Sequence, residues 1–169
     1  MATITRRATV ADARAIAALQ GRAFWRNYAD LVDASLLGEA DEETRAAEWV
    51  ARLSFAPGET FVADVAGAVR GVVTIGPSSE DADVAGAFGT GEVASLYVDP
   101  PAQGAGLGTA LATEADQALR AAGHAAATLR VLEGNEHART FYERRGWTLV
   151  PGRGTPHPWG THVLYRREL

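Results

Sequence analysis

The stretch EVASLYVDPPAQGAGLGTALATEADQAL, residues 92–119, predicts a strand, a turn and a helix in immediate succession. Its two prolines end the strand, because proline cannot donate a hydrogen bond within a sheet. Its last part carries apolar residues at helical spacing. Between them lie Gly104, Gly106 and Gly108, although a glycine inside a helix costs about 1 kcal/mol relative to alanine. These glycines therefore need a role other than stabilising the helix.

A glycine-rich turn in front of a helix is suited to bind an anion. Its backbone N–H groups can approach a ligand closely, the first helical turn adds N–H groups without helical partners, and the helix dipole favours negative charge. The sequence QGAGLG, residues 103–108, thus predicts a site for a pyrophosphate. The residues alone also allow a simple turn, since the chain has 18 glycines. The pattern is not a P-loop, which would need a following lysine.

The elements around this stretch predict an α/β chain, or α+β by some schemes, with one mixed central sheet. The order β-α-α-β-β-β-α-β-α-β-β implies six to seven strands and four helices in a single domain over residues 1–169. The strand–helix–strand unit in the middle predicts a parallel pair, and the flanking hairpins make the sheet mixed. Asp12 and Asn135 are the expected helix caps. We expect strands at 3–9, in two runs within 59–77, and at 92–100, 125–134, 147–152 and 161–169, with helices at 10–32, at 41–53, ending near 122 and at 135–146.

Composition restricts the classes of function. The 169-residue chain, with 47% hydrophobic and 22% charged residues, can bury one globular core. The absence of cysteine excludes disulfides and a cysteine nucleophile, and the four histidines lack metal-ligand spacing, so we expect no metal. The net charge of −5 disfavours nucleic acid as a partner. Because the chain lacks an apolar run of about 18 residues and a signal peptide, we expect no membrane contact and a cytoplasmic location.

Two motifs together resemble the GNAT superfamily of acyl-coenzyme A-dependent N-acyltransferases. The first is GEVASLYVDPPAQGAGLGTAL, residues 91–111, whose QGAGLG fits the Q/R-x-x-G-x-G/A signature of that family. The second is LRVLEGNEHARTFYERRGW, residues 129–147, in which an asparagine opens a helix that carries a phenylalanine–tyrosine pair. A further likeness, AFWRNYADLVDASLL at 23–37 followed by EETRAAEWVARL at 42–53, is to a common bacterial branch of the same family.

The resemblance implies acetyl-CoA as co-substrate. The backbone of the glycine-rich turn would hold the pyrophosphate, and the preceding strand would pair with the pantetheine arm like an added strand. A bulge in that strand would direct an N–H at the thioester oxygen. Asn135 would bind the pantetheine arm, or act as a helix cap alone. Arg139, with Arg144 or Arg145, would reach the phosphates, or belong to a solvated basic face. The residues implied in binding are Leu96, Tyr97, Val98, Gln103, Gly104, Ala105, Gly106, Leu107, Gly108, Thr109, Asn135 and Arg139.

Two residues are implied to carry the chemistry. Tyr142 would be the general acid that protonates the departing thiolate, although a phenol with a pKa of about 10 needs proximity and a dry site for this. Glu92 lies where several family members have a general base, which an ammonium acceptor requires before it can attack. Without cysteine there is no acyl-cysteine intermediate, so direct attack in a ternary complex is expected. The simpler roles are a packed amphipathic tyrosine and a solvated carboxylate.

The expected acceptor is a small-molecule primary amine. The resemblance places its site between the first two helices and the loop joining the last two strands, where Trp25, Tyr28 and Trp159 could stack on a flat or cationic group. Helical spacing equally allows Trp25 and Trp49 to be core residues. The loop at 155–160 could form a wall of the site, cover a sheet edge or contact a second subunit of a homodimer. The sequence also allows a non-catalytic acyl-CoA-binding regulatory module, or an acetylase of a protein N-terminus or side chain.

Overall fold

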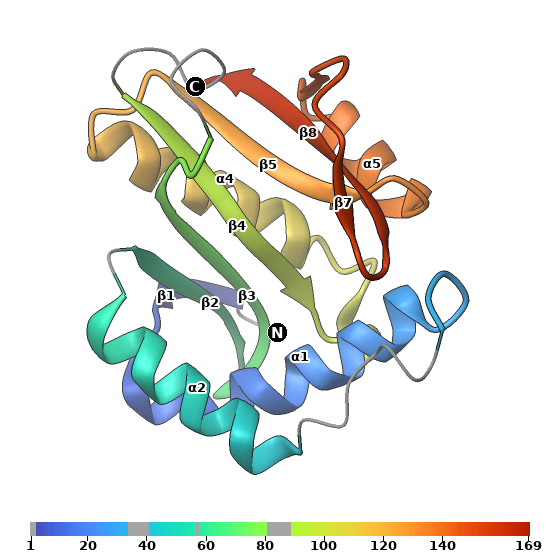
Figure 1. The fold of residues 1–169 in the computed structure, drawn as a ribbon. Coiled ribbons are helices and arrows are strands. Elements are labelled where there is room, and N and C mark those ends of the chain that lie inside the picture. The colour runs from blue at the N-terminus through green and yellow to red at the C-terminus, as the bar shows by residue number, and fades with distance from the viewer. Residues whose placement is uncertain (1–2, 34–40, 57, 81–88) are drawn as a thin grey trace.

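A mixed sheet runs through the protein, with helices on both of its faces (Figure 1). The computed structural model describes residues 3–33, 41–56, 58–80 and 89–169, and within them the sheet has eight strands. The strand order is β1-β2-β3-β4-β5-β8-β6, and β7 pairs with β8. The strands are β1 (Thr3–Arg7), β2 (Glu59–Val65), β3 (Ala68–Pro77), β4 (Thr90–Val98), β5 (Ala126–Leu132), β6 (Thr148–Leu149), β7 (Thr155–His157) and β8 (Gly160–Glu168). The helices are α1 (Ala13–Tyr28), α2 (Glu42–Phe55), α4 (Leu107–Ala121) and α5 (Glu136–Glu143), with 3₁₀ turns η1 (Val10–Asp12) and η3 (Pro100–Ala102).

The predicted α/β class and mixed sheet are confirmed, with one added strand. The segment 153–159, expected as a loop, contains β7, which pairs with β8 through His157 and Gly160. Gly160 has a φ of +120°, which glycine adopts freely and which lets the chain reverse between the two strands. Pro156 is tolerated in β7 because this strand lies at the edge of the sheet.

Helix α4 packs on one face of the sheet through the apolar stripe expected from its sequence. The buried residues of this stripe are Leu107, Leu111, Ala115 and Leu119. They share one core with side chains of β2, β3, β4, β5 and β8, and Tyr142 of α5 packs against the same core. Ala122, the residue after the end of α4, is exposed.

Helices α1 and α2 cover the other face (Figure 1). Leu19 of α1 and Trp49 of α2 are buried with Val62 and Val72 of the sheet. The indole N–H of Trp49 donates to Gln20 Oε1 at 2.8 Å, which satisfies a polar atom that burial would otherwise leave unpaired. Trp49 is therefore a core residue. None of the helices in the described ranges has the length and apolar character needed to cross a membrane.

Strands β4 and β5 are parallel neighbours that pair over a short distance. Their ladder joins residues Thr90–Glu92 to Ala126–Thr128, although β4 continues to Val98 and β5 to Leu132. In the described chain the two strands thus part beyond Glu92, and the second half of β4 keeps β3 as its neighbour. This parting positions the candidate site.

A bulge interrupts β4 just after the point of parting. Ser95 pairs with Thr74, and Val93 pairs with Ile75, so Ala94 stands between them as an extra residue. Such a bulge re-aims the backbone groups of the strand. The bulge expected in this strand is therefore present, and Ala94 is exposed.

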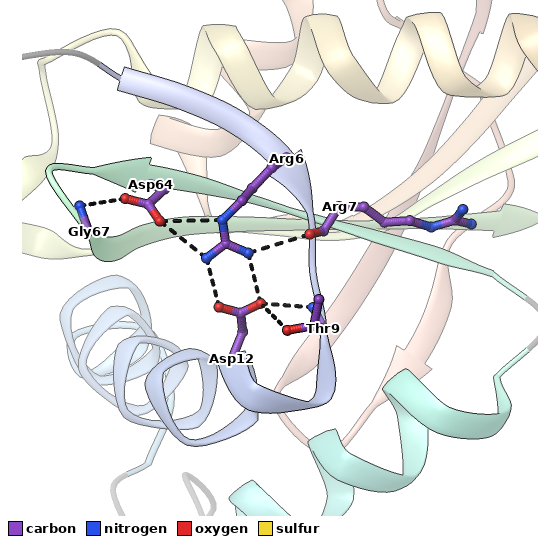
Figure 2. A network of polar contacts seen from close by, with 6 residues as sticks. All are labelled: Arg6, Arg7, Thr9, Asp12, Asp64 and Gly67. Carbon is purple, nitrogen blue, oxygen red and sulfur yellow. Dashed lines mark hydrogen bonds and ion pairs between the residues drawn. The ribbon is translucent and has the colours of Figure 1, made fainter.

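Asp12 does not cap α1, contrary to the expectation from sequence. Its backbone is already helical, with φ −82° and ψ −12°, so its carboxylate points back and accepts a hydrogen bond from the N–H of Thr9 at 2.8 Å. The same carboxylate binds the two terminal nitrogens of Arg6 at 2.8 and 2.9 Å. Arg6 also donates to Asp64 at 3.1 Å, and the carboxylate of Asp64 in turn accepts from the N–H of Gly67 (Figure 2). This cluster ties β1 and β2 to the start of α1.

The Arg6–Asp12 contact predicts a loss of stability in acid. Hydrogen bonds from Arg6 lower the pKa of Asp12 from 3.8 to about 2. Because the folded-state pKa is depressed, this contribution is complete above about pH 5 and is lost as the pH falls to about 2. We expect Asp12→Asn to reduce the free energy of unfolding at neutral pH by about 1–2 kcal/mol and to flatten its fall in acid. Urea titrations at several pH values measure both, and an unchanged slope in the variant would contradict the assignment.

Candidate active site

A cavity of about 360 Å³ lies beside the second half of β4, between the start of α4 and the length of α5. Its lining residues are Asn27, Leu96, Val98, Gln103, Gly104, Gly106, Leu107, Gly108, Thr109, His137, Ala138, Phe141 and Tyr142. Most residues implied in acyl-CoA binding are thus gathered around one space. Four implied residues are not in this lining, namely Tyr97, Ala105, Asn135 and Arg139.

The lining also contains residues that sequence reasoning missed. His137, Ala138 and Phe141 belong to α5 and share the helical spacing of Tyr142, so the periodicity around that residue could have identified them. Asn27 comes from α1, far away in the chain, and no local signal marks it. Tyr97 is absent from the lining because neighbouring side chains in a strand alternate, and it packs instead under α1 and α2.

Gly104 and Gly106 give the glycine-rich turn its shape. Their φ angles are +79° and +82°, in the left-handed region that other residues reach only at a cost. The first hydrogen bond of α4 runs from the N–H of Ala110 to the carbonyl of Gly106, so the N–H groups of 107–109 precede the helical ladder. Gly108 is not left-handed, and a Cβ there would meet an aromatic ring at an ordinary distance of 3.5 Å. The left-handed backbone thus requires glycine at positions 104 and 106 but not at position 108.

Tyr142 is a partly buried phenol in the wall of the cavity. Its ring lies 5.2 Å from that of Phe141 and 6.0 Å from that of Trp147, both edge-on. Burial raises the pKa of Tyr142 well above its usual value of 10, and the nearby phenols of Tyr28 and Tyr97 raise it further. The hydroxyl therefore carries its proton throughout the neutral range and can serve there as a proton donor.

Asn135 caps α5, as the sequence predicts. Its Oδ1 accepts a hydrogen bond from the N–H of Ala138 at 3.1 Å. Burial raises the pKa of Tyr28, and the nearby side chain of Asn135, the smaller effect, lowers it. Asn135 thus lies where the end of α1 meets the start of α5.

Glu92 is the last residue of β4 that pairs with β5, at the point where these two strands part. Its Oε2 accepts hydrogen bonds from the N–H of Ser79 at 3.0 Å and from the hydroxyl of Ser79 at 2.8 Å. The next residue, Val93, belongs to the core under α4, so alternation along the strand directs Glu92 to the other face of the sheet. Tyr142 packs on the α4 face. The two candidate catalytic side chains therefore approach the parting from opposite faces.

The arginines of the α5 region lie in two places. Arg139 donates hydrogen bonds to the hydroxyl of Tyr165 and to the carbonyl of Glu133, both at 3.0 Å, and so points away from the cavity. Its position explains this, because two residues along a helix differ in direction by roughly 200°, and the ring two residues later lines the cavity. Arg144 and Arg145 line a neighbouring hollow of about 740 Å³ that reaches the start of α4.

Aromatic side chains of α1 meet the β7–β8 hairpin. The ring of Trp159 lies 4.7 Å from that of Phe24 and 6.0 Å from that of Tyr28. Of the aromatic residues expected at an acceptor site, Tyr28 and Trp159 therefore lie together. Trp25 does not join them, since it is 51% exposed on α1, and it is not a core residue either.

Two histidines extend this cluster along the hairpin. The ring of His157 lies 4.7 Å from that of Trp159 and 4.6 Å from that of His162. Burial lowers the pKa of His162, and His157 and Arg130 lower it further. Arg130 itself forms a two-pronged ion pair with Glu80, at 2.6 and 2.7 Å. Among the residues that the structure describes, no three His, Cys, Asp or Glu side chains gather closely enough to hold a metal ion.

The glycine geometry predicts different costs for two neighbouring substitutions. Gly106→Ala should lower the free energy of unfolding by about 1–2 kcal/mol, because alanine resists the left-handed conformation. Gly108→Ala should leave stability unchanged or raise it by up to about 1 kcal/mol, because alanine favours the helix. Urea denaturation of both variants measures the difference, and equal effects would show that the left-handed backbone is not what requires Gly106.

Comparison with known proteins places this site in a family. The family model described as the acetyltransferase (GNAT) family matches residues 24–147. Over 61 residues the chain is 49% identical to the mycothiol acetyltransferase of Beutenbergia cavernae, a match that covers 36% of this chain and 20% of that protein. The match to this curated relative thus spans about a fifth of the relative's length.

Solved structures share the fold at low sequence identity. A PaiA N-acetyltransferase from Thermoplasma acidophilum, in complex with coenzyme A, has a TM-score of 0.80 at 16% identity, with both chains fully covered. YncA, a putative acetyltransferase from Salmonella typhimurium with its cofactor acetyl-CoA, has a TM-score of 0.74 at 22% identity, with 100% of this chain and 95% of that chain covered. The family model, which matches most of the chain, confirms the resemblance seen in the two motifs. The chain belongs to the GNAT family of acetyltransferases.

Proposed function

We propose that this enzyme transfers an acetyl group from acetyl-CoA to a small primary amine by direct attack in a ternary complex. The observation that carries the proposal is the parting of β4 and β5, with the glycine-rich turn and Tyr142 around one cavity. Structural relatives with coenzyme A or acetyl-CoA support the donor. The net charge of −5 disfavours nucleic acid as acceptor. We place the reaction in the cytoplasm.

The donor site would use backbone groups for most of its contacts. The N–H groups at the start of α4, with the two left-handed glycines before them, suit a pyrophosphate. The edge of β4 beyond Glu92 lacks β5 as a partner, so its N–H and carbonyl groups suit the amides of pantetheine. Arg144 and Arg145 in the neighbouring hollow suit the phosphates of the nucleotide.

The chemistry would take place at the gap between the strands. The amine attacks the thioester carbon, and the N–H freed by the bulge at Ala94 would receive the developing oxyanion. The C–S bond then breaks, and Tyr142 gives its proton to the thiolate. Burial raises the pKa of the departing thiol as it raises that of the phenol, so the raised pKa of Tyr142 does not by itself oppose the transfer. An ammonium acceptor and acetyl-CoA thus yield an amide, free thiol and one proton released to solvent.

Glu92 would prepare the acceptor from the other face. Its Oε2 is fixed by two hydrogen bonds from Ser79, which holds the carboxylate in one orientation. It would take the proton of the ammonium group directly or through water. Tyr28 and Trp159, next to each other between α1 and the hairpin, would form part of the acceptor wall.

Release of free thiol from acetyl-CoA in the presence of amines tests the proposed function. A panel of polyamines, amino acids, amino sugars and peptides with free N-termini would report the acceptor class. Turnover with at least one amine is the expected result. Tight binding of acetyl-CoA without turnover on any of them would favour the regulatory module, and turnover on peptides alone would favour a protein acetylase.

Tyr142→Phe should lower kcat by about 10–100-fold and leave the KM for acetyl-CoA near its wild-type value, because the hydroxyl would act on the leaving thiolate alone. The raised pKa of Tyr142 adds a pH test. The wild-type rate should not fall through ionisation of this group below about pH 10. Steady-state kinetics across pH measure both effects. An unchanged kcat in the variant would remove Tyr142 from the chemistry.

Glu92→Gln should lower kcat/KM at neutral pH by about 10–100-fold. The loss should shrink as the pH approaches the pKa of the acceptor amine, because an amine already deprotonated needs no base. The pH profile of kcat/KM for variant and wild type measures this. A loss that stays constant with pH would instead indicate that Glu92 binds the acceptor.

A further inference from the structure

A buried carboxylate stands directly before the turn that leads to the glycines. Asp99 follows β4 and precedes η3, and it is 0% exposed. It accepts hydrogen bonds from Nε and Nη2 of Arg22, at 2.9 and 3.1 Å, and from Nη1 of Arg70, at 2.8 Å. Its own N–H donates to the carbonyl of Arg70 at 2.8 Å. Arg22 belongs to α1 and Arg70 to β3, so the side chain of Asp99 links the end of β4 to both of these elements.

The carboxylate of Asp99 binds the two arginines and does not cap the 3₁₀ turn. Asp99 occupies the N-cap position of η3, but its side chain accepts no capping hydrogen bond there. Burial alone would raise the pKa of Asp99, but the two guanidinium groups outweigh it and lower the pKa, so the group is ionised at neutral pH. A buried charge depends on its partners, and loss of one partner leaves it uncompensated. The buried charge of Asp99 therefore requires both arginines to stay in their present positions.

Asp99 also directs the chain into the glycine-rich turn. Its carbonyl accepts from the N–H of Ala102 at 2.8 Å, and the carbonyl of Pro100 accepts from the N–H of Gln103 at 3.2 Å. The side chain of Gln103 returns to the carbonyl of Val98 at 3.3 Å. The chain from Val98 to Gln103 is thus internally bonded, and the arginines set its orientation.

Arg22 connects this segment to α1. The same helix, α1, provides Asn27 to the lining of the cavity, and its last residue, Tyr28, lies near Asn135. The Asp99 cluster therefore holds the glycine-rich turn and the α1 wall in one fixed relation.

We propose that Asp99, through Arg22 and Arg70, is a positioning residue that pre-forms the acyl-CoA site by fixing the glycine-rich turn against α1. The inference rests on the proposed function, because it takes acyl-CoA as the ligand of the turn. Asp99 does not line the cavity, so its influence reaches the ligand through the backbone of the turn. Backbone N–H groups that already have the correct arrangement do not need to be ordered when the ligand binds. Loss of the cluster should therefore weaken donor binding more than it slows the chemical step.

The cluster in Figure 2 offers a matched control. Asp12 is also a buried carboxylate that accepts two hydrogen bonds from one guanidinium, that of Arg6. The Arg6–Asp12 contact links β1 to η1, and neither Arg6 nor Asp12 lines the cavity. Asp99→Asn and Asp12→Asn each remove one buried charge of the same kind, but only Asp99→Asn lies next to the glycine-rich turn.

The experiment compares wild type with these two variants. Calorimetric titration gives the Kd of coenzyme A, steady-state kinetics give kcat and the KM for acetyl-CoA, and urea denaturation gives the midpoint of unfolding. We expect Asp99→Asn to raise Kd and KM about tenfold with kcat at saturation within about threefold of wild type. Asp12→Asn should lower the unfolding midpoint comparably and change Kd by less than about twofold.

The outcomes separate the positioning role from the proposed function. If wild type binds coenzyme A and Asp99→Asn binds it equally well, or if Asp12→Asn weakens it as much, the positioning role is overturned. A wild-type protein that binds no coenzyme A overturns the proposed function, and the inference with it. If Asp99→Asn does not fold, Arg22→Gln and Arg6→Gln replace the pair, since these arginine side chains are 49% and 37% exposed. A raised Kd in Arg22→Gln alone supports the role, and equal Kd values overturn it.

Discussion

The separation of β4 from β5 is the constraint on which the rest of the site depends. The two strands share three residue pairs and then part, so the edge of β4 keeps main-chain groups that a continuous sheet would pair. One apolar core nevertheless spans both strands, since Leu111 of α4 lies in the same core as Val93 of β4 and Leu129 of β5. Burial in this core stabilises both strands beyond the point where their ladder ends.

The parting also connects the two faces of the sheet. Tyr142 packs on the face covered by α4, and alternation directs Glu92 to the face shared with α1 and α2. A group transfer between two substrates needs a base near the nucleophile and an acid near the leaving group, and an acyl carbon in the gap would lie between them. Burial favours the protonated form of Tyr142, which suits the acid, while the carboxylate held by Ser79 suits the base.

Two clusters of arginine and aspartate fix the ends of strands against helical elements. Each contains a buried carboxylate, Asp12 or Asp99, that is satisfied by guanidinium groups from other elements. The cost of removing such charges from water offsets much of their attraction, so their main effect lies in the fixed directions that they require. The Asp12 cluster fixes the segment from β1 to η1, and the Asp99 cluster fixes the segment that leads to the glycine-rich turn.

The sequence by itself determined the features that depend on near neighbours: the order of elements, the glycine-rich turn, the cap at Asn135 and the family. Local patterns failed at Asp12, whose helical backbone turned its carboxylate toward Arg6, and at β7, whose strand character came from pairing with β8. Only the tertiary structure decided that Asn27 lines the cavity, and that Asp99 meets an arginine 77 residues away. Such contacts follow from how α1 packs on the sheet, and they are invisible to local periodicity because their partners are separated in sequence and joined only by the fold.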